Sequence, residues 1–110
     1  MIRFIDSLYC SKSVESKISQ IKWKTVCGIG MISTYFITLS LSENDLFDIY
    51  SAKVFKQRGF RKSNLVIIGV AGSYDEATEL VAEIINNILQ KGVDIKDIRS
   101  FCEKHVADNI

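Results

Sequence analysis

The chain has 110 residues, of which 47% are hydrophobic and 25% charged, and its formal net charge is +1. This length suffices for one domain, and the apolar content excludes an intrinsically disordered chain. The near-neutral charge excludes strong attraction of the whole molecule to nucleic acid or to anionic lipid. We therefore expect a single domain over residues 1–110.

The first half of the chain predicts a strand, a helix and a hairpin. Residues 2–9 alternate loosely between apolar and polar side chains, as in a short strand. Residues 13–27 repeat apolar side chains three and four positions apart, which predicts a helix. The β-branched and aromatic residues 32–41 predict the strongest strand, and a polar turn joins it to a second strand over residues 46–50. A short helix is then expected over residues 51–58.

Alternation along the hairpin predicts how its side chains divide between the two faces of the sheet. One face is expected to carry Tyr35, Ile37, Leu39 and Leu41. The face opposite the helices is expected to carry Phe36, Thr38 and Phe47. An apolar sheet face left open in this way usually contacts a partner, so the pattern predicts self-association.

The second half predicts a buried strand followed by two helices. Residues 64–71 form an apolar run of strand length, and residues 73–91 carry a continuous apolar stripe. Ser73 and Glu76 have the spacing of a helix capping box. Asp94 begins a final helix. The order (β)-α-β-β-(α)-β-α-α predicts an α+β fold, with a small antiparallel sheet of three to four strands and helices packed on one face.

The basic segment 53–62 combines cations with aromatic rings, which are the ingredients of single-stranded nucleic-acid binding. Trp23 lies between two lysines and extends this surface if the first helix lies nearby. The candidate macromolecule-binding residues are Trp23, Lys53, Lys56, Arg58, Phe60, Arg61 and Lys62. The simpler interpretation is a solvated loop whose two aromatic side chains anchor it in the core.

The cysteines and the single histidine are the residues that could bind a metal or act as a nucleophile. Cys102 and His105 share a helical face, but a structural zinc needs four ligands, and Cys10 and Cys27 are remote in sequence. A catalytic Cys–His pair needs an exposed thiol, whereas Cys102 falls on the apolar side of its helix. We therefore expect no catalytic residue, no metal and no cofactor. The odd number of cysteines favours reduced thiols in the cytoplasm.

The segment Gly69–Ser73 leads from a strand into a helix, as phosphate-binding loops do. It lacks the lysine of a Walker A motif and the G-x-G-x-x-G spacing. Asp75 and Glu76 in the first helical turn would also repel a phosphate. A structural helix cap is therefore the favoured interpretation.

Two pairs of carboxylates remain as candidates for acid–base chemistry. Asp45 and Asp48 flank a strand start, and Glu79 and Glu83 are one helical turn apart. Neither pair has a neighbour in sequence that would shift its pKa in an identifiable way, so both are interpreted as polar surface.

Four segments resemble a group of short bacterial proteins, mainly of Firmicutes, to which no activity is assigned. These segments are residues 21–24 (IKWK), the pair Gly28 and Gly30, residues 35–39 (YFITL) and residues 68–77 (IGVAGSYDEA) followed by Leu80 and Val81. The resemblance extends over residues 15–90. It implies a fold shared by small accessory proteins, and it implies no site residues.

The sequence as a whole favours a small non-enzymatic binding module that acts through protein–protein contacts, with self-association as its simplest form. Small size and the lack of a catalytic set are typical of phage or mobile-element inhibitors, such as anti-CRISPR proteins, and of regulators. The alternative is nucleic-acid binding through residues 53–62. Residues 1–10 lack the apolar core of a signal peptide, and no apolar run is long enough to span a membrane, so a cytoplasmic protein without a membrane partner is expected.

Overall fold

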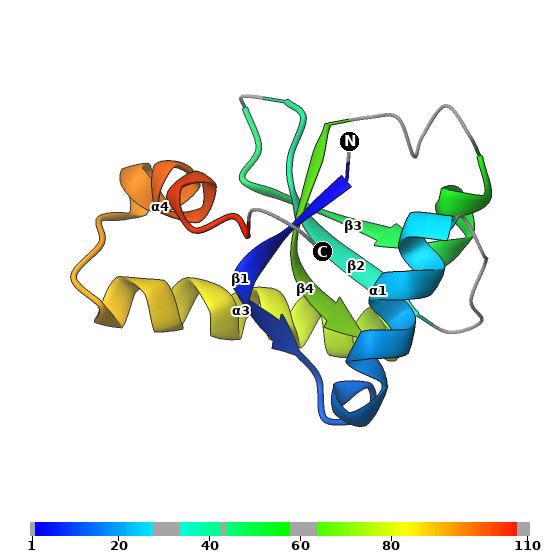
Figure 1. The fold of residues 1–110 in the computed structure, drawn as a ribbon. Helices are drawn as coiled ribbons and strands as arrows, with labels where there is room; N and C mark the ends of the chain where they lie inside the picture. Colours follow the sequence, from blue (N-terminus) through cyan, green and yellow to red (C-terminus); the bar gives the residue numbers. More distant parts are fainter. Residues whose placement is uncertain (1, 28–33, 43, 58–63, 108–110) are drawn as a thin grey trace.

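The computed structural model describes residues 2–27, 34–42, 44–57 and 64–107, with residues 23–27 and 55–56 described through their backbone alone. Four strands form one sheet with the spatial order β1-β4-β2-β3 (Figure 1). The strands are β1 (Ile2–Cys10), β2 (Tyr35–Leu39), β3 (Phe47–Ser51) and β4 (Leu65–Ala71).

In the part of the chain that the structure describes, three α-helices and three short 3-10 turns connect or follow the strands. The helices are α1 (Ile18–Cys27), α3 (Tyr74–Gln90) and α4 (Ile98–Lys104). The 3-10 turns are η1 (Glu15–Lys17), η2 (Ala52–Lys56) and η3 (Ile95–Asp97). The α+β class and the predicted order of elements are confirmed, although the helix expected over residues 51–58 is the short turn η2. Among the described residues, no helix is long and apolar enough to cross a membrane.

The sheet is mixed, so the prediction of an antiparallel sheet is wrong at one pairing. β2 pairs antiparallel with β3 and with β4, but β1 pairs parallel with β4. A tight turn imposes antiparallel pairing only on the two strands that it joins, which here are β2 and β3. β1 reaches its neighbour through α1 and the hairpin, and this long connection permits parallel pairing.

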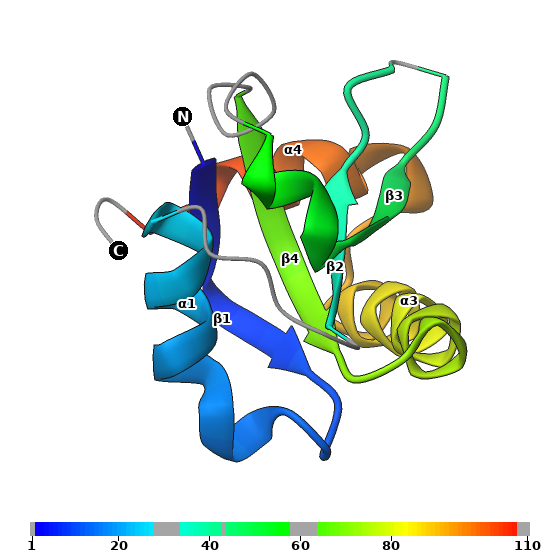
Figure 2. The same ribbon diagram turned by 90° about the vertical axis from the view of Figure 1, so that its right-hand side faces the viewer.

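Helices cover both faces of the sheet, so the prediction that they pack on one face is also wrong. Figure 2 shows α1 and α3 on opposite sides of the strands. The helices α3 and α4 pack on Ile37, Val66 and Ile68, whereas Ile21 of α1 belongs to a second core that contains Phe36. The physical reason is that the first helix also has an apolar stripe, which must be buried against something.

The face expected to be open is therefore closed. Phe36 and Thr38 are both 0% exposed, because the α1 side of the molecule covers them. Phe47 packs instead on the core beneath α3. The alternation predicted for β2 is confirmed, with Ile37 and Leu39 on the α3 side, but the strand ends at Leu39. The apolar face that suggested self-association is part of the core.

The C-terminal residues after α4 close the outer edge of β1. The Asp6 N–H donates to the His105 carbonyl oxygen at 2.7 Å, and the Ala107 N–H donates to the Phe4 carbonyl oxygen at 2.8 Å. Ile5 and Val106 form an antiparallel bridge between these two hydrogen bonds. One margin of the sheet is thus paired by the chain itself.

Replacing Phe36 tests whether this face of the sheet is buried. We expect Phe36→Ala to lower the free energy of unfolding by about 3–5 kcal/mol, because it leaves a cavity beneath the α1 side. The control Leu41→Ala truncates a side chain that is 60% exposed and should change stability far less. Urea denaturation measures both. Equal, small effects of the two substitutions would show that the Phe36 face is open after all.

Candidate functional site

The structure describes little of the basic segment that the sequence singles out. Lys53 is exposed in η2, and Trp23 and Lys56 are placed by their backbone in α1 and η2. The other predicted residues, Arg58, Phe60, Arg61 and Lys62, lie outside the described residues. Nucleic-acid binding by this segment therefore stays a prediction.

Cys102 and His105 do not form a nucleophile–base pair. The Cys102 side chain is 0% exposed in the core beneath α3, and burial raises the pKa of its thiol to about 11. The thiol is therefore protonated at neutral pH. The His105 ring stacks on Phe101 with 4.3 Å between ring centroids, and its Nδ1 lies 2.7 Å from the Phe101 carbonyl oxygen. Both side chains thus serve the packing of the C-terminal helix.

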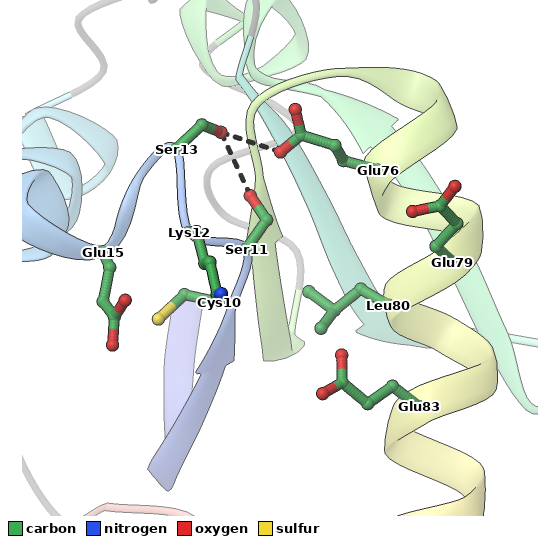
Figure 3. A pocket seen from close by; sticks show the side chains of 9 residues that line it. All are labelled: Cys10, Ser11, Lys12, Ser13, Glu15, Glu76, Glu79, Leu80 and Glu83. Atoms are coloured by element: carbon green, nitrogen blue, oxygen red, sulfur yellow. Dashed lines mark hydrogen bonds between the residues drawn. The ribbon is translucent and has the colours of Figure 1, made fainter.

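A polar hollow of about 590 Å³ lies between the end of β1 and α3. Figure 3 shows Ser11 and Ser13, from the loop after β1, with their hydroxyl groups directed toward Glu76 of α3. Its lining consists of Cys10, Ser11, Lys12, Ser13, Glu15, Glu76, Glu79, Leu80 and Glu83. Four carboxylates and one ammonium group make this hollow acidic. No group of three or more His, Cys, Asp and Glu side chains among the described residues is arranged to hold a metal ion.

Hydrogen bonds across this hollow tie the loop before α1 to the start of α3. The Ser13 hydroxyl donates to Glu76 Oε1 at 2.7 Å, and the Gly72 N–H donates to the Ser11 hydroxyl at 3.2 Å. The approach is so close that a Cβ atom on Gly72 would lie 2.2 Å from the Ser13 hydroxyl oxygen. Only glycine therefore permits this contact.

The predicted helix cap is confirmed in one of its two halves. The Ser73 hydroxyl accepts a hydrogen bond from the Glu76 N–H at 3.1 Å, as the N-cap of α3. In a complete capping box the Glu76 side chain would return to the Ser73 N–H. Here the Glu76 carboxylate binds Ser13 instead, so the helix start is joined to a distant loop. Gly69 is also structural, because a Cβ atom there would lie 3.2 Å from side-chain atoms of Leu80 and Ile84.

Two side chains of the hollow, Glu76 and Cys10, have pKa values shifted by their surroundings. Hydrogen bonds from Ser11, Ser13 and the Gly72 backbone lower the pKa of Glu76, so this carboxylate is ionised at neutral pH and is a poor proton donor. Burial, together with the nearby charge of Glu15, raises the pKa of Cys10 and so disfavours its thiolate. The hydrogen-bonded carboxylate thus acts as a latch between two segments.

A second polar contact organises the opposite end of the sheet. The Arg99 guanidinium donates three hydrogen bonds to backbone carbonyl oxygens of the β2–β3 loop. The acceptors are Ser40 at 3.0 Å, Ser42 at 3.2 Å and Asp45 at 2.7 Å. The planar guanidinium suits this task because its N–H groups form a rigid fork. We call residues 40–42, 44–46 and 95–100 together the hairpin–helix surface.

The hairpin–helix surface carries large apolar side chains in contact with solvent. Leu41 is 60% exposed and Ile95 is 63% exposed, and each lies in one of the two segments that Arg99 joins. A hollow of about 470 Å³ separates the segments. Its lining consists of Asn44, Asp45, Leu46, Ile95, Lys96, Arg99 and Ser100. A hydrogen-bonded loop, exposed apolar side chains and polar lining residues thus occur together in these two segments.

The sequence pattern predicts other roles for the residues of this surface. It places Leu41 on the face of a strand, whereas β2 ends two residues earlier. Asp45 and Asp48 make different contacts: the Asp45 backbone carbonyl oxygen accepts a hydrogen bond from Arg99, and the Asp48 carboxylate accepts one from the Tyr50 hydroxyl at 3.3 Å. Nothing in the local pattern around Arg99 indicates contacts with a loop more than fifty residues earlier.

Comparison of the chain with protein-family models, with curated proteins and with solved structures gives no match in any of the three. Functional inference therefore rests on the described residues and on the sequence.

The pH dependence of stability tests the Glu76 latch. Because the pKa of Glu76 is lower in the folded chain than its ordinary value of 4.5, its ionised form stabilises the fold above that value. This contribution is lost as the pH falls through the folded-state pKa. We expect Glu76→Gln to destabilise the protein at pH 7 and to matter progressively less below pH 4.5, as measured by urea denaturation.

A matched control for this experiment is Glu79→Gln, which removes a carboxylate from the same hollow but leaves the Ser13–Glu76 hydrogen bond in place. Its effect at pH 7 should be smaller. A Glu76→Gln penalty that stays constant across this pH range would contradict the latch.

Proposed function

We propose that this chain is a protein-binding module that contacts its partner through the hairpin–helix surface. The observation that carries the proposal is the exposure of Leu41 and Ile95 on two segments that Arg99 holds together. In this proposal the chain is a small cytoplasmic accessory protein that inhibits or regulates a larger partner.

The energetics of exposed apolar side chains support a protein partner. Full burial of one leucine or isoleucine side chain is worth about 1.5–3 kcal/mol relative to leaving it in water. Binding also costs free energy when loops must be ordered, and the three hydrogen bonds from Arg99 order this loop beforehand. Polar side chains such as Asn44 and Lys96 lie beside Ile95 around the hollow, as in the rim of a typical interface.

The remaining chemistry of the described residues also favours binding over catalysis. The buried Cys102 thiol is protonated, and the His105 Nδ1 is engaged by a backbone carbonyl. In the acidic hollow of Figure 3, the Glu76 carboxylate accepts a hydrogen bond from Ser13 of the same chain. None of these groups is paired as a nucleophile with a base.

A capture experiment with matched variants tests the proposal. The tagged wild type and the double variant Leu41→Ser with Ile95→Ser are used to capture proteins from a lysate of the cells that produce this chain. We expect a specific partner to be retained by the wild type and lost by at least tenfold with the double variant, because two apolar anchors are removed. The captured proteins are quantified by mass spectrometry.

The control variant is Leu89→Ser, which replaces another exposed leucine, on α3 and not among the residues of the hairpin–helix surface. It should retain the partner as the wild type does. The proposal would be contradicted if the wild type, the double variant and Leu89→Ser captured the partner equally. It would also be contradicted if Leu89→Ser lost the partner as strongly as the double variant does.

A second candidate function is nucleic-acid binding, which the exposed Lys53 at the start of the basic segment favours. Replacing Arg58 and Arg61 by alanine tests it, with a fluorescent single-stranded oligonucleotide as the probe. If both arginines contact phosphates, the slope of log affinity against log salt should fall by about 1.4 for the double variant. The control pair Lys96→Ala with Lys104→Ala, outside this segment, should leave the slope unchanged. An unchanged slope for the arginine variant would remove this function.

A further inference from the structure

The two margins of the sheet differ in how their backbone groups are paired. The outer edge of β1 is hydrogen-bonded to residues 105–107. At the other margin, β3 has a neighbouring strand on one side only among the strands that the structure describes (Figure 2). An exposed strand edge is a template for pairing with another strand.

The register of the hairpin determines which backbone groups of β3 point away from β2. The Ser40 N–H donates to the Leu46 carbonyl oxygen at 3.0 Å, and the Ala52 N–H donates to the Thr34 carbonyl oxygen at 2.8 Å. Hydrogen-bonded positions alternate in an antiparallel pair, so every second residue of β3 is bonded to β2. The residues between them, whose N–H and C=O groups point outward, are Phe47, Ile49 and Ser51.

We propose that two copies of this chain associate through the outer edges of their β3 strands, antiparallel and related by a two-fold axis perpendicular to the sheet. Ile49 then faces Ile49 of the second copy, and Phe47 faces Ser51 of the second copy. Each of these facing pairs has outward backbone groups on both strands, so each forms two hydrogen bonds. The two sheets become continuous, with the α3 helices on the same side.

The single charge on β3 selects this register over its neighbours. Asp48 is the only charged residue in Phe47–Ser51. A slip by one position in each strand toward the hairpin would place Asp48 opposite Asp48 of the second copy, with Cα atoms about 4.5 Å apart, and like charges directly opposite are destabilising. In the proposed register Asp48 instead faces Tyr50 of the second copy, which carries no charge.

The opposite slip, toward η2, is also less favourable. It places Tyr50 opposite Tyr50 of the second copy and leaves Phe47 without a facing residue in β3. Fewer outward backbone groups then find a partner. In the proposed register the outward N–H and C=O groups of Phe47, Ile49 and Ser51 all have partners. The Asp48 residues of the two copies do not face each other. The interface does not include Leu41 or Ile95, so it is independent of the proposed function.

Light scattering after size-exclusion chromatography, over a wide range of protein concentration, measures the association. We expect the wild type to reach twice the chain mass and Ile49→Pro to remain monomeric. Proline removes the outward N–H of Ile49 but none of the hydrogen bonds to β2, so circular dichroism should show an unchanged fold. The double variant Leu41→Ser with Ile95→Ser should still dimerise, which separates this proposal from the proposed function.

Amide hydrogen exchange of the wild type, followed residue by residue by NMR, gives a test that needs no folded variant. Exchange at Ile49 should slow as the protein concentration rises, whereas exchange at Tyr50, whose N–H points to β2, should not. A wild type that is monomeric throughout would overturn the proposal. So would a dimer that survives Ile49→Pro, or one in which Ile49 exchange is independent of concentration.

Discussion

The burial of β4 on both faces is the constraint on which the rest of the structure depends. Every position of Leu65–Ala71 is buried, and the strand lies between β1 and β2. A strand buried on both faces needs an apolar layer above and below it. The helices α1 and α3 supply these layers, and Gly69 allows α3 to approach closely. Both faces of β4 are therefore part of the core that the described residues form.

Two polar contacts at opposite ends of the sheet fix loops that the core cannot hold. Ser13 and Glu76 join the loop after β1 to the start of α3, and Arg99 joins the β2–β3 loop to α4. Both contacts connect residues more than fifty positions apart. Their hydrogen bonds offset the conformational entropy that is lost when these segments are ordered. The difference lies in what they leave exposed: carboxylates at the first contact and large apolar side chains at the second.

The sequence predicted local secondary structure correctly more often than it predicted which parts of the chain contact one another. Alternation placed Ile37 and Leu39 together because the period of a strand is a local property, and Ser73 was recognised as a cap from its spacing to Glu76. The open face assigned to Phe36 was wrong because alternation separates two faces without showing what covers each. The three contacts of Arg99 were missed because no local pattern connects a helix residue to distant carbonyl oxygens.

With both faces of β4 buried, the described residues offer candidate interaction surfaces at the ends and margins of the sheet. Leu41 is exposed just after the end of β2, and Ile95 is exposed in η3, between α3 and α4. At the β1 margin, the backbone of residues 105–107 satisfies groups that the sheet leaves unpaired. At the β3 margin, the outward groups of Phe47, Ile49 and Ser51 pair with no other described strand. The same core that removes the predicted sheet-face contact thus leaves a loop surface and a strand edge as the surfaces suited to protein contacts.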